Sequence, residues 1–333
     1  MLSLLKELNY HQYVLYHFLI LNGGRICSSS ISDDGDDLII NNKNTLKPDI
    51  IIKDLGSVNY IIQLRNTNIV TCSCDHTSRI IQLFPKKKYK IIQTLKEHTN
   101  IVTKAIELED GKLLTVGNDK FIIMWKQNPK NNNLYEIEKK IKCSINENPY
   151  PNIVLINNDL LLCTSISDYR LRFYEINNNF QLAFCFNDVY FSFYRNSILY
   201  INEKDLLLVG GKDDNGIYLF KLKKIPAFIG KFLCDWINQV NSIILLEDGD
   251  ILMAVKEKNK EKEKGGESGG DENEKYSYSI CKFGINGNKF TLLDKAKNAH
   301  KDLINEIIYW KKYDLFLSGS EDNTIKIWRM NKK

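Results

Sequence analysis

Short apolar runs alternate with polar turns along most of the chain, and the pattern is clearest near the C-terminal end. An Ile-rich run at Leu303–Tyr309 is followed by Leu315–Ser318 and, after the polar turn Gly319–Asn323, by the alternating segment Thr324–Trp328. β-Branched and aromatic runs bounded by Gly, Asn and Asp predict strands joined by tight turns. Such a small antiparallel unit cannot bury both of its faces alone, so neighbours of the same kind are expected.

A second segment, His98–Trp125, repeats this pattern with nearly the same spacing. The four chemically distinctive positions are His98, Thr115, Asp119 and Trp125 in one segment and His300, Ser318, Asp322 and Trp328 in the other. A buried Asp and an indole N–H each need a hydrogen-bond partner, which favours a structural role for these residues. A Ser/His/Asp nucleophilic triad is the alternative, but a triad is not expected to occur twice with a Trp attached.

These positions resemble the WD40 repeat family, in which His, Ser/Thr, Asp and Trp form a buried hydrogen-bond relay within each blade of a β-propeller. The resemblance implies an all-β fold, a seven-bladed WD40-like propeller with four-stranded antiparallel blades. It also implies that an N-terminal strand, for which Leu2–Leu8 is the candidate, completes the last blade and so closes the ring. Closure of this kind removes the free sheet edge.

The remaining repeats follow from the turn aspartates, which recur at intervals of about 40 to 50 residues. A single domain, 1–333, is expected, with repeats at about 10–42, 55–84, 95–126, 150–175, 195–221, 237–284 and 298–329. In the second repeat the third strand is expected to start late, at Ile80–Phe84. The outer strand of the fifth repeat is expected at about Phe232–Ile237.

Residues 256–275 interrupt the sixth repeat with Lys, acidic residues and Gly and contain no large apolar side chain. A segment of this composition cannot bury apolar surface, so disorder is expected there. A tolerated low-complexity insertion and a mobile arm that gates or tethers partners are both consistent with it. A turn absorbs such an insertion at a modest loop-closure cost.

Composition excludes few classes of protein. The apolar fraction of 43% is ordinary for a globular domain, and the net charge of +5 does not by itself indicate nucleic-acid binding. Eight scattered Cys without a CxxC pair are expected to be reduced, which indicates a cytoplasmic or nuclear protein. The apolar run Tyr13–Leu21 is too short to span a bilayer, and no other segment approaches that length. We expect no transmembrane segment, no metal site and no cofactor.

No phosphate-binding loop, dinucleotide fingerprint, HExxH or GxSxG motif is present, so the protein is not expected to be an enzyme. The resemblance implies instead that loops on the wider face of the propeller bind peptides or proteins. The candidate residues that this implies are Asn100, Asn118, Ser167, Asp213, Asn238, Asp302 and Glu321. A non-enzymatic interaction scaffold or adaptor is expected, a monomeric propeller within a hetero-complex.

The alternative is a propeller that binds nucleic acid or anionic lipid through its narrower face. Lys86, Lys87, Lys88 and Lys90 are the candidates, with Lys221, Lys223 and Lys224 following another third strand. Only Tyr89 is interleaved with the first group, which weakens the case for nucleic acid. Salt dependence distinguishes the two functions, because binding dominated by phosphate contacts weakens steeply with added salt.

Overall fold

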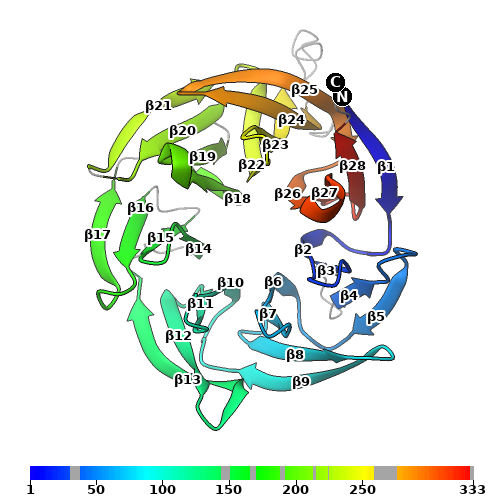
Figure 1. Ribbon diagram of the computed structural model, residues 1–333, viewed down its shortest axis with the longest axis vertical. Coiled ribbons are helices and arrows are strands. Elements are labelled where there is room, and N and C mark those ends of the chain that lie inside the picture. Colours follow the sequence, from blue (N-terminus) through cyan, green and yellow to red (C-terminus); the bar gives the residue numbers. More distant parts are fainter. Residues whose placement is uncertain are drawn as a thin grey trace, which may run out of the picture. The chain divides into compact units, whose positions relative to one another are not determined.

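The computed structural model describes residues 1–30, 38–143, 151–165, 170–187, 192–212, 215–223, 225–258 and 276–330. The chain divides into two compact units, Tyr16–Tyr190 and a second unit that joins Met1–Leu15 to Phe191–Lys333 (Figure 1). In the described residues the regular structure is β-strand, apart from the 3-10 helices η1 (Asn202–Lys204) and η2 (Lys311–Tyr313). The prediction of an all-β fold is confirmed.

The unit Tyr16–Tyr190 contains four antiparallel sheets, each with four strands in chain order. The first two sheets are β2 (Leu15–Ile20), β3 (Ile26–Ser30), β4 (Leu38–Asn41), β5 (Pro48–Ile52) and β6 (Val58–Gln63), β7 (Ile69–Ser73), β8 (Ser78–Phe84), β9 (Lys88–Leu95). The next two are β10 (Val102–Glu107), β11 (Leu113–Gly117), β12 (Phe121–Asn128), β13 (Asn131–Lys142) and β14 (Pro151–Leu155), β15 (Leu160–Ser165), β16 (Leu171–Glu175), β17 (Gln181–Phe186).

The other unit contains one eight-stranded and one four-stranded sheet. The larger sheet comprises β18 (Ser192–Ile201), β19 (Leu206–Lys212), β20 (Gly216–Lys221), β21 (Ala227–Leu233), β22 (Ile237–Leu245), β23 (Ile251–Lys258), β24 (Tyr276–Asn286) and β25 (Lys289–His300). The smaller comprises β26 (Ile304–Trp310), β27 (Leu315–Ser320), β28 (Ile325–Met330) and β1 (Leu2–Leu8). Strand β1 pairs antiparallel with β28, which confirms that an N-terminal strand completes the last four-stranded sheet.

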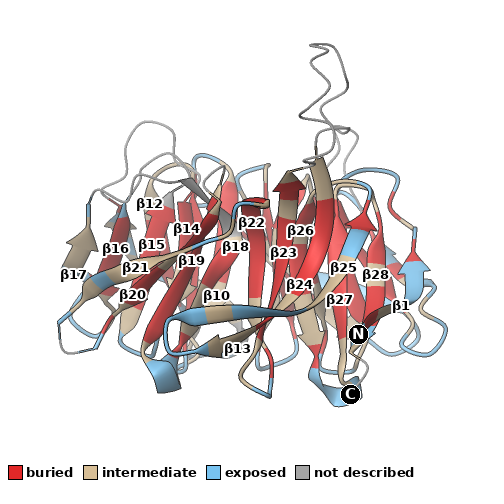
Figure 2. Cartoon of the chain, turned by 90° about the horizontal axis from the view of Figure 1, so that it is seen from above, coloured by how far each residue is buried: buried red, intermediate tan, exposed pale blue. Residues whose placement is uncertain are grey.

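Within each unit the apolar cores lie between successive sheets. In Tyr16–Tyr190, for example, Val70 and Ile80 from one sheet pack with Trp125 from the next. In the other unit, Leu252 and Ile280 pack with Phe316. Figure 2 shows β22 and β23 buried over most of their length, whereas the edge strands β1 and β25 carry exposed stretches. Alternating side chains therefore bury both faces of a sheet, as repeated stacking requires.

The sheet count differs from the predicted seven separate blades. Five sheets are four-stranded, and β18–β25 form one eight-stranded sheet because β18 and β22 are joined by the single parallel pair Asn196↔Ser242. The propeller type of blade, four-stranded and antiparallel, is confirmed, but the count of seven is not.

Three predicted boundaries were wrong. Strand β8 begins at Ser78, so the core aromatic position of the second repeat is filled by Ile81, which is fully buried, and Phe84 is 41% exposed. Strand β21 ends at Leu233, and a turn closed by the Ile237 N–H to the Cys234 carbonyl (2.9 Å) separates it from β22. Strand β23 continues through Lys258 by pairing with β24, so 256–258 are not part of a disordered insertion; 259–275 lie outside the described residues.

Candidate functional site

The structure brings the four predicted side chains of the third repeat together. His98 Nδ1 lies 2.9 Å from Asp119 Oδ2, and His98 Nε2 lies 2.9 Å from Thr115 Oγ1. The Trp125 indole N–H donates to the same Thr115 oxygen at 2.9 Å. A carboxylate only accepts, so Nδ1–H donates to Asp119 and, in the neutral tautomer, Nε2 accepts from the Thr115 hydroxyl. Every polar group in this chain of bonds has a partner.

The last repeat contains the same arrangement with Ser in place of Thr. His300 Nδ1 lies 2.9 Å from Asp322 Oδ2, His300 Nε2 lies 2.6 Å from Ser318 Oγ, and the Trp328 indole N–H donates to Ser318 Oγ at 2.8 Å. This geometry contains the contacts of a Ser/His/Asp triad, but Ser318 is fully buried and its oxygen is occupied by Trp328. Such a hydroxyl is not positioned to attack a substrate.

Electrostatics in the last repeat favour a neutral His300 imidazole hydrogen-bonded to an ionised Asp322 carboxylate. Burial lowers the pKa of His300 below its ordinary value, although Asp322 acts in the opposite direction. Burial acts to raise the pKa of Asp322. The hydrogen bond from His300 and the charge that His300 carries when protonated outweigh burial, and hydrogen bonds from Thr324 and the Lys301 N–H act in the same direction. The pKa of Asp322 therefore lies far below its usual range. Near neutral pH, Asp322 is therefore an ionised acceptor surrounded by donors.

Other repeats keep the hydroxyl but lack the His. Thr71 and Thr164 are fully buried, and among the described residues neither hydroxyl has a hydrogen-bond partner. In the fifth repeat the position is Gly210, where a Cβ would lie 2.7 Å from Val240, so a hydroxyl-bearing side chain does not fit there. The second, fourth and fifth repeats therefore lack the relay that the third and last repeats contain.

One histidine of the same type was missed in the sequence. His11 precedes β2 by the same interval as His98 precedes β10 and His300 precedes β26. It is 8% exposed, and burial lowers its pKa to about 4. The sequence could have indicated this position, because His11 stands just before the apolar run Tyr13–Leu21.

In the unit Tyr16–Tyr190, the candidate face contributes Asn100 and Asn118, from the β9–β10 and β11–β12 connections. Asn100 is exposed, and its side-chain oxygen accepts from the Ile101 N–H at 2.8 Å. Asn118 is half-buried, and its Oδ1 is buried without a hydrogen-bond partner among the described residues. Antiparallel strands place these two connections at one end of the sheet.

In the other unit, Asn238, Asp302 and Glu321 lie at the corresponding end. Asn238 is 7% exposed, with its Oδ1 buried and unpartnered among the described residues. Burial and the neighbouring Asp302 carboxylate raise the pKa of Glu321, and Asn305 and Lys256 act in the opposite direction. These three side chains present hydrogen-bond acceptors to this end. Ser167 and Asp213 lie outside the described residues.

The lysines of the alternative interface are distributed over both units. Lys86, Lys88 and Lys90 are exposed, whereas Lys87 pairs with Asp49 at 2.9 Å. Lys221 and Lys223 donate to the backbone carbonyls of Lys204 (2.6 Å) and Asn202 (2.9 Å). Lys221 and Lys223 therefore hold η1 in place. Lys224 lies outside the described residues.

The described residues contain neither a metal-binding cluster nor a membrane-spanning helix. No group of three or more His, Cys, Asp or Glu side chains is arranged to hold a metal ion. No helix of the described chain is long and apolar enough to cross a membrane.

Comparison with known proteins assigns one segment of the chain. Residues 293–329 match the family model described as WD domain, G-beta repeat. The match covers β26, β27, all of β28 except its last residue, and all four residues of the His300 relay. No curated protein matches the chain.

Proposed function

Because its last repeat is a WD40 repeat and its sheets are propeller blades, we propose that this protein is a non-enzymatic scaffold or adaptor of an intracellular complex. WD40 propellers generally serve as platforms for protein interaction. The observation that carries the proposal is the His300 relay inside the matched segment. The Ser318 hydroxyl of this relay is hydrogen-bonded to both His300 and Trp328, so the relay stabilises the repeat. A cytoplasmic or nuclear location is part of the proposal and is supported by eight free cysteines.

The proposal includes seven blades. The eight-stranded sheet is joined by one residue pair between β18 and β22, whereas β18–β21 and β22–β25 each form continuous antiparallel ladders. A single parallel bridge adds little to either ladder, so each half has the composition of one four-stranded blade. Two blades here and five separate sheets elsewhere support the count.

The wider face is the proposed binding surface, and the acceptor groups described above support it. The buried oxygens of Asn118 and Asn238 have no partners in the described chain, and leaving such an acceptor unpaired is costly. Asp302 and Glu321 add carboxylates to the Asn238 neighbourhood. A partner that supplies N–H donors or basic side chains pairs with the Asp302 and Glu321 carboxylates, which favours binding of a protein or peptide over binding of a phosphate-rich ligand.

Affinity purification from the protein's own cells, followed by mass spectrometry, tests this proposal. Glu321→Lys and Asn118→Lys alter the wider face, and Glu109→Lys, at an exposed position of the β10–β11 connection and so at the opposite end of the sheet from Asn118, is the control with a matched charge change. We expect wild type and the control to recover a small stoichiometric set of proteins that the wider-face variants lose.

Two outcomes contradict the proposal. If folded wider-face variants retain every partner, the assignment to that face is wrong. If RNA or lipid is recovered without a stable protein set, and its retention falls steeply between about 50 and 200 mM salt, the lysine-rich alternative replaces the scaffold.

A further inference from the structure

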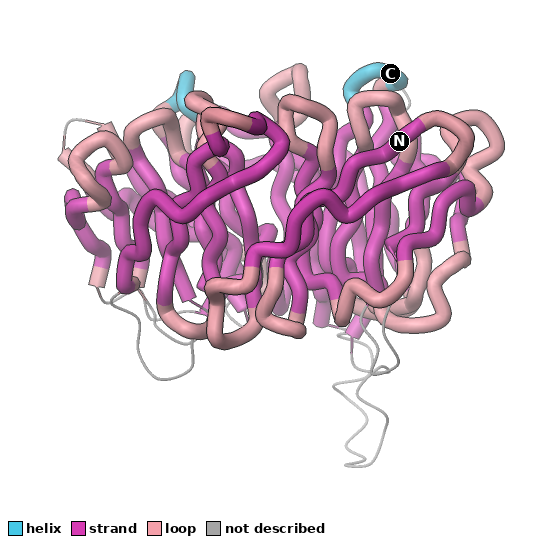
Figure 3. Tube along the Cα trace, turned by 90° about the horizontal axis from the view of Figure 1, so that it is seen from below, coloured by secondary structure: helices cyan, strands magenta, loops and turns pink. Residues whose placement is uncertain are grey.

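A pocket of about 530 Å³ lies in the unit that contains Phe191–Lys333, at the end of its sheets opposite Asn238, Asp302 and Glu321. It lies among three connections, β18–β19 with η1, β22–β23, and β26–β27 with η2. Figure 3 shows both short helices, in cyan, at the same end of the strands. The volume is within the range of about 300–1,000 Å³ that is typical of ligand sites.

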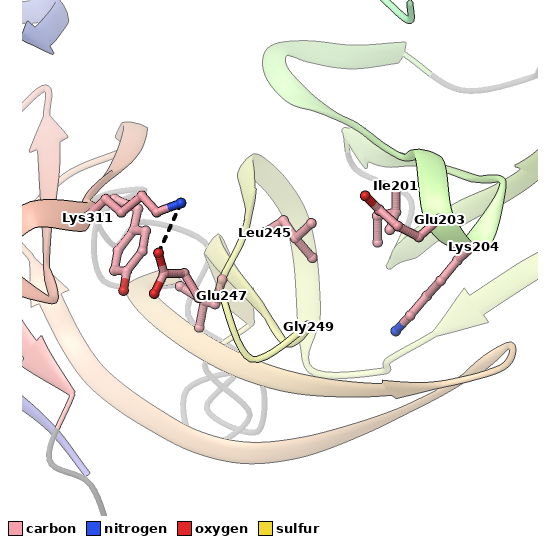
Figure 4. A pocket seen from close by; sticks show the side chains of 9 residues that line it. Ile201, Glu203, Lys204, Leu245, Glu247, Gly249 and Lys311 are labelled. Carbon is pink, nitrogen blue, oxygen red and sulfur yellow. Dashed lines mark ion pairs between the residues drawn. The ribbon is translucent and has the colours of Figure 1, made fainter.

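The lining combines an apolar floor with a charged rim (Figure 4). Ile201, Leu245 and Leu246 supply aliphatic surface, and Tyr309 adds a ring. Ile201 and Leu246 belong to the buried core, at 2% and 3% exposure, so the floor is a fixed part of the fold. An apolar side chain of a ligand would exchange water for this surface.

Hydrogen bonds hold two walls of the pocket rigid. The Tyr200 hydroxyl donates to Asp205 at 3.0 Å beside η1, and the Tyr309 hydroxyl donates to Asp314 at 2.7 Å beside η2. Burial and the adjacent carboxylates raise the pKa of both tyrosines to about 12, so each stays a donor. The same Tyr–Asp hydrogen bond therefore occurs beside η1 and beside η2. It preorganises both connections, which lowers the entropy cost of binding.

The third wall is the turn between β22 and β23. Lys282 pairs with Asp248 at 2.7 Å and with Asp250 at 2.8 Å, and the Gly249 N–H donates to the Leu246 carbonyl at 3.1 Å. Gly249 has φ +82°, and the space beside it is open, so the backbone of this turn is accessible from the pocket.

The rim is charged but balanced. Glu247 and Lys311 form an ion pair of 3.1 Å on one side, with both side chains more than half exposed. On the other side, Lys204 donates to the Ile285 carbonyl at 3.3 Å, and Glu203 has no hydrogen bond or ion pair among the described residues. Lys311 and Lys204 are both engaged in these contacts, so Glu203 is the rim charge without a partner among the described residues, and it favours a cationic group on the ligand.

We propose that this pocket is a second docking site, which takes a short peptide segment of a partner protein. The segment inserts one aliphatic or aromatic side chain over Leu245 and Leu246, and an adjacent Arg or Lys pairs with Glu203. The site is separate from Asn238, Asp302 and Glu321 and lies at the other end of the sheets that carry them.

Selection of a phage-displayed library of random 12-residue peptides on the immobilised full-length protein tests the proposal. Enriched peptides are then measured by fluorescence anisotropy against wild type and three variants. Glu203→Lys reverses the unpaired charge, and Glu247→Trp fills the mouth of the pocket from an exposed turn position. Asp235→Lys, an exposed residue of the same unit beside the other end of the sheet, is the control with a matched charge change.

We expect enriched peptides to combine an apolar residue with a neighbouring Arg or Lys. We also expect Glu203→Lys and Glu247→Trp each to weaken binding about tenfold or more, while Asp235→Lys leaves it unchanged. Circular dichroism confirms that each variant is folded. The proposal is overturned if no peptide depends on the pocket, or if enriched peptides bind both pocket variants as tightly as wild type. Neither result bears on the wider face, because that assignment is tested with Glu321→Lys and Asn118→Lys.

Discussion

Replacing Thr by Val at equivalent positions should have opposite consequences in two neighbouring repeats. Thr115 lies at the centre of β11 and Thr71 at the centre of β7, and both are fully buried. Thr115 pairs with Ala105 and Ile123, and Thr71 has the corresponding ladder partners on β6 and β8. Val has the shape of Thr without the hydroxyl, so the substitution isolates the contribution of that group.

The hydrogen bonds set the magnitudes. Thr115→Val leaves the Trp125 N–H and His98 Nε2 without their partner, and each buried orphan costs about 1–3 kcal/mol, so the free energy of unfolding should fall by about 2–6 kcal/mol. The Thr71 hydroxyl has no partner in the described chain. Thr71→Val removes a buried unsatisfied group and should be neutral or stabilising by about 1 kcal/mol.

Urea unfolding followed by far-ultraviolet circular dichroism measures the difference. Thr164→Val provides a second case without a hydrogen-bond partner and should behave like Thr71→Val. Thr291→Val, at an exposed position of β25, reports the intrinsic strand preference of Val alone. The reasoning is refuted if Thr71→Val destabilises as much as Thr115→Val, or if Thr115→Val costs no more than Thr291→Val.

Two further predictions concern buried charge. Asp322→Asn should cost about 2–4 kcal/mol at pH 7, measured by urea unfolding. Because the pKa of Asp322 is lowered in the folded state, the wild-type advantage is complete above the ordinary carboxyl pKa of about 3.9 and shrinks as the pH falls below it; a pH-independent penalty would contradict this. Lys295→Met removes the cation beside the nearly buried Glu257 and should cost about 3–5 kcal/mol, with recovery in a Glu257→Gln/Lys295→Met double variant. Thermal unfolding beside Lys297→Met, an exposed lysine of the same strand, checks this, and equal losses would be evidence against it.

Much of the local architecture was predictable because it depends on short-range pattern. The alternation at Thr324–Trp328 and the turn before it predicted a strand that the structure places at β28. The equal spacing of His, Ser/Thr, Asp and Trp in two segments predicted groups that the structure brings within hydrogen-bond distance. Leu2–Leu8 was predicted as a strand and forms β1 at the edge of the last sheet.

The errors arose where side-chain type and strand register disagreed. The third strand of the second repeat was expected at Ile80–Phe84, ending on an aromatic residue, yet β8 begins at Ser78, pairs Ile81 with Ile69 and buries Ile81, whereas Phe84 is exposed. Register along a strand decides which face a side chain occupies, and a shift of one residue exchanges the two faces. The polar residues 256–258 continue β23 because β24 provides hydrogen-bond partners for their backbone.

By itself, then, the sequence determined the strand pattern, the repeats and the two hydrogen-bond relays, because each depends on residues close together within one repeat. Tertiary structure decided the pocket beside η1 and η2, since its floor and rim come from connections far apart in the chain. It also decided the pairing of Glu257 with Lys295, which lie on β23 and β25 and meet only after the sheet has formed. Contacts of this kind carry no spacing signature, because loop closure and sheet order bring their members together.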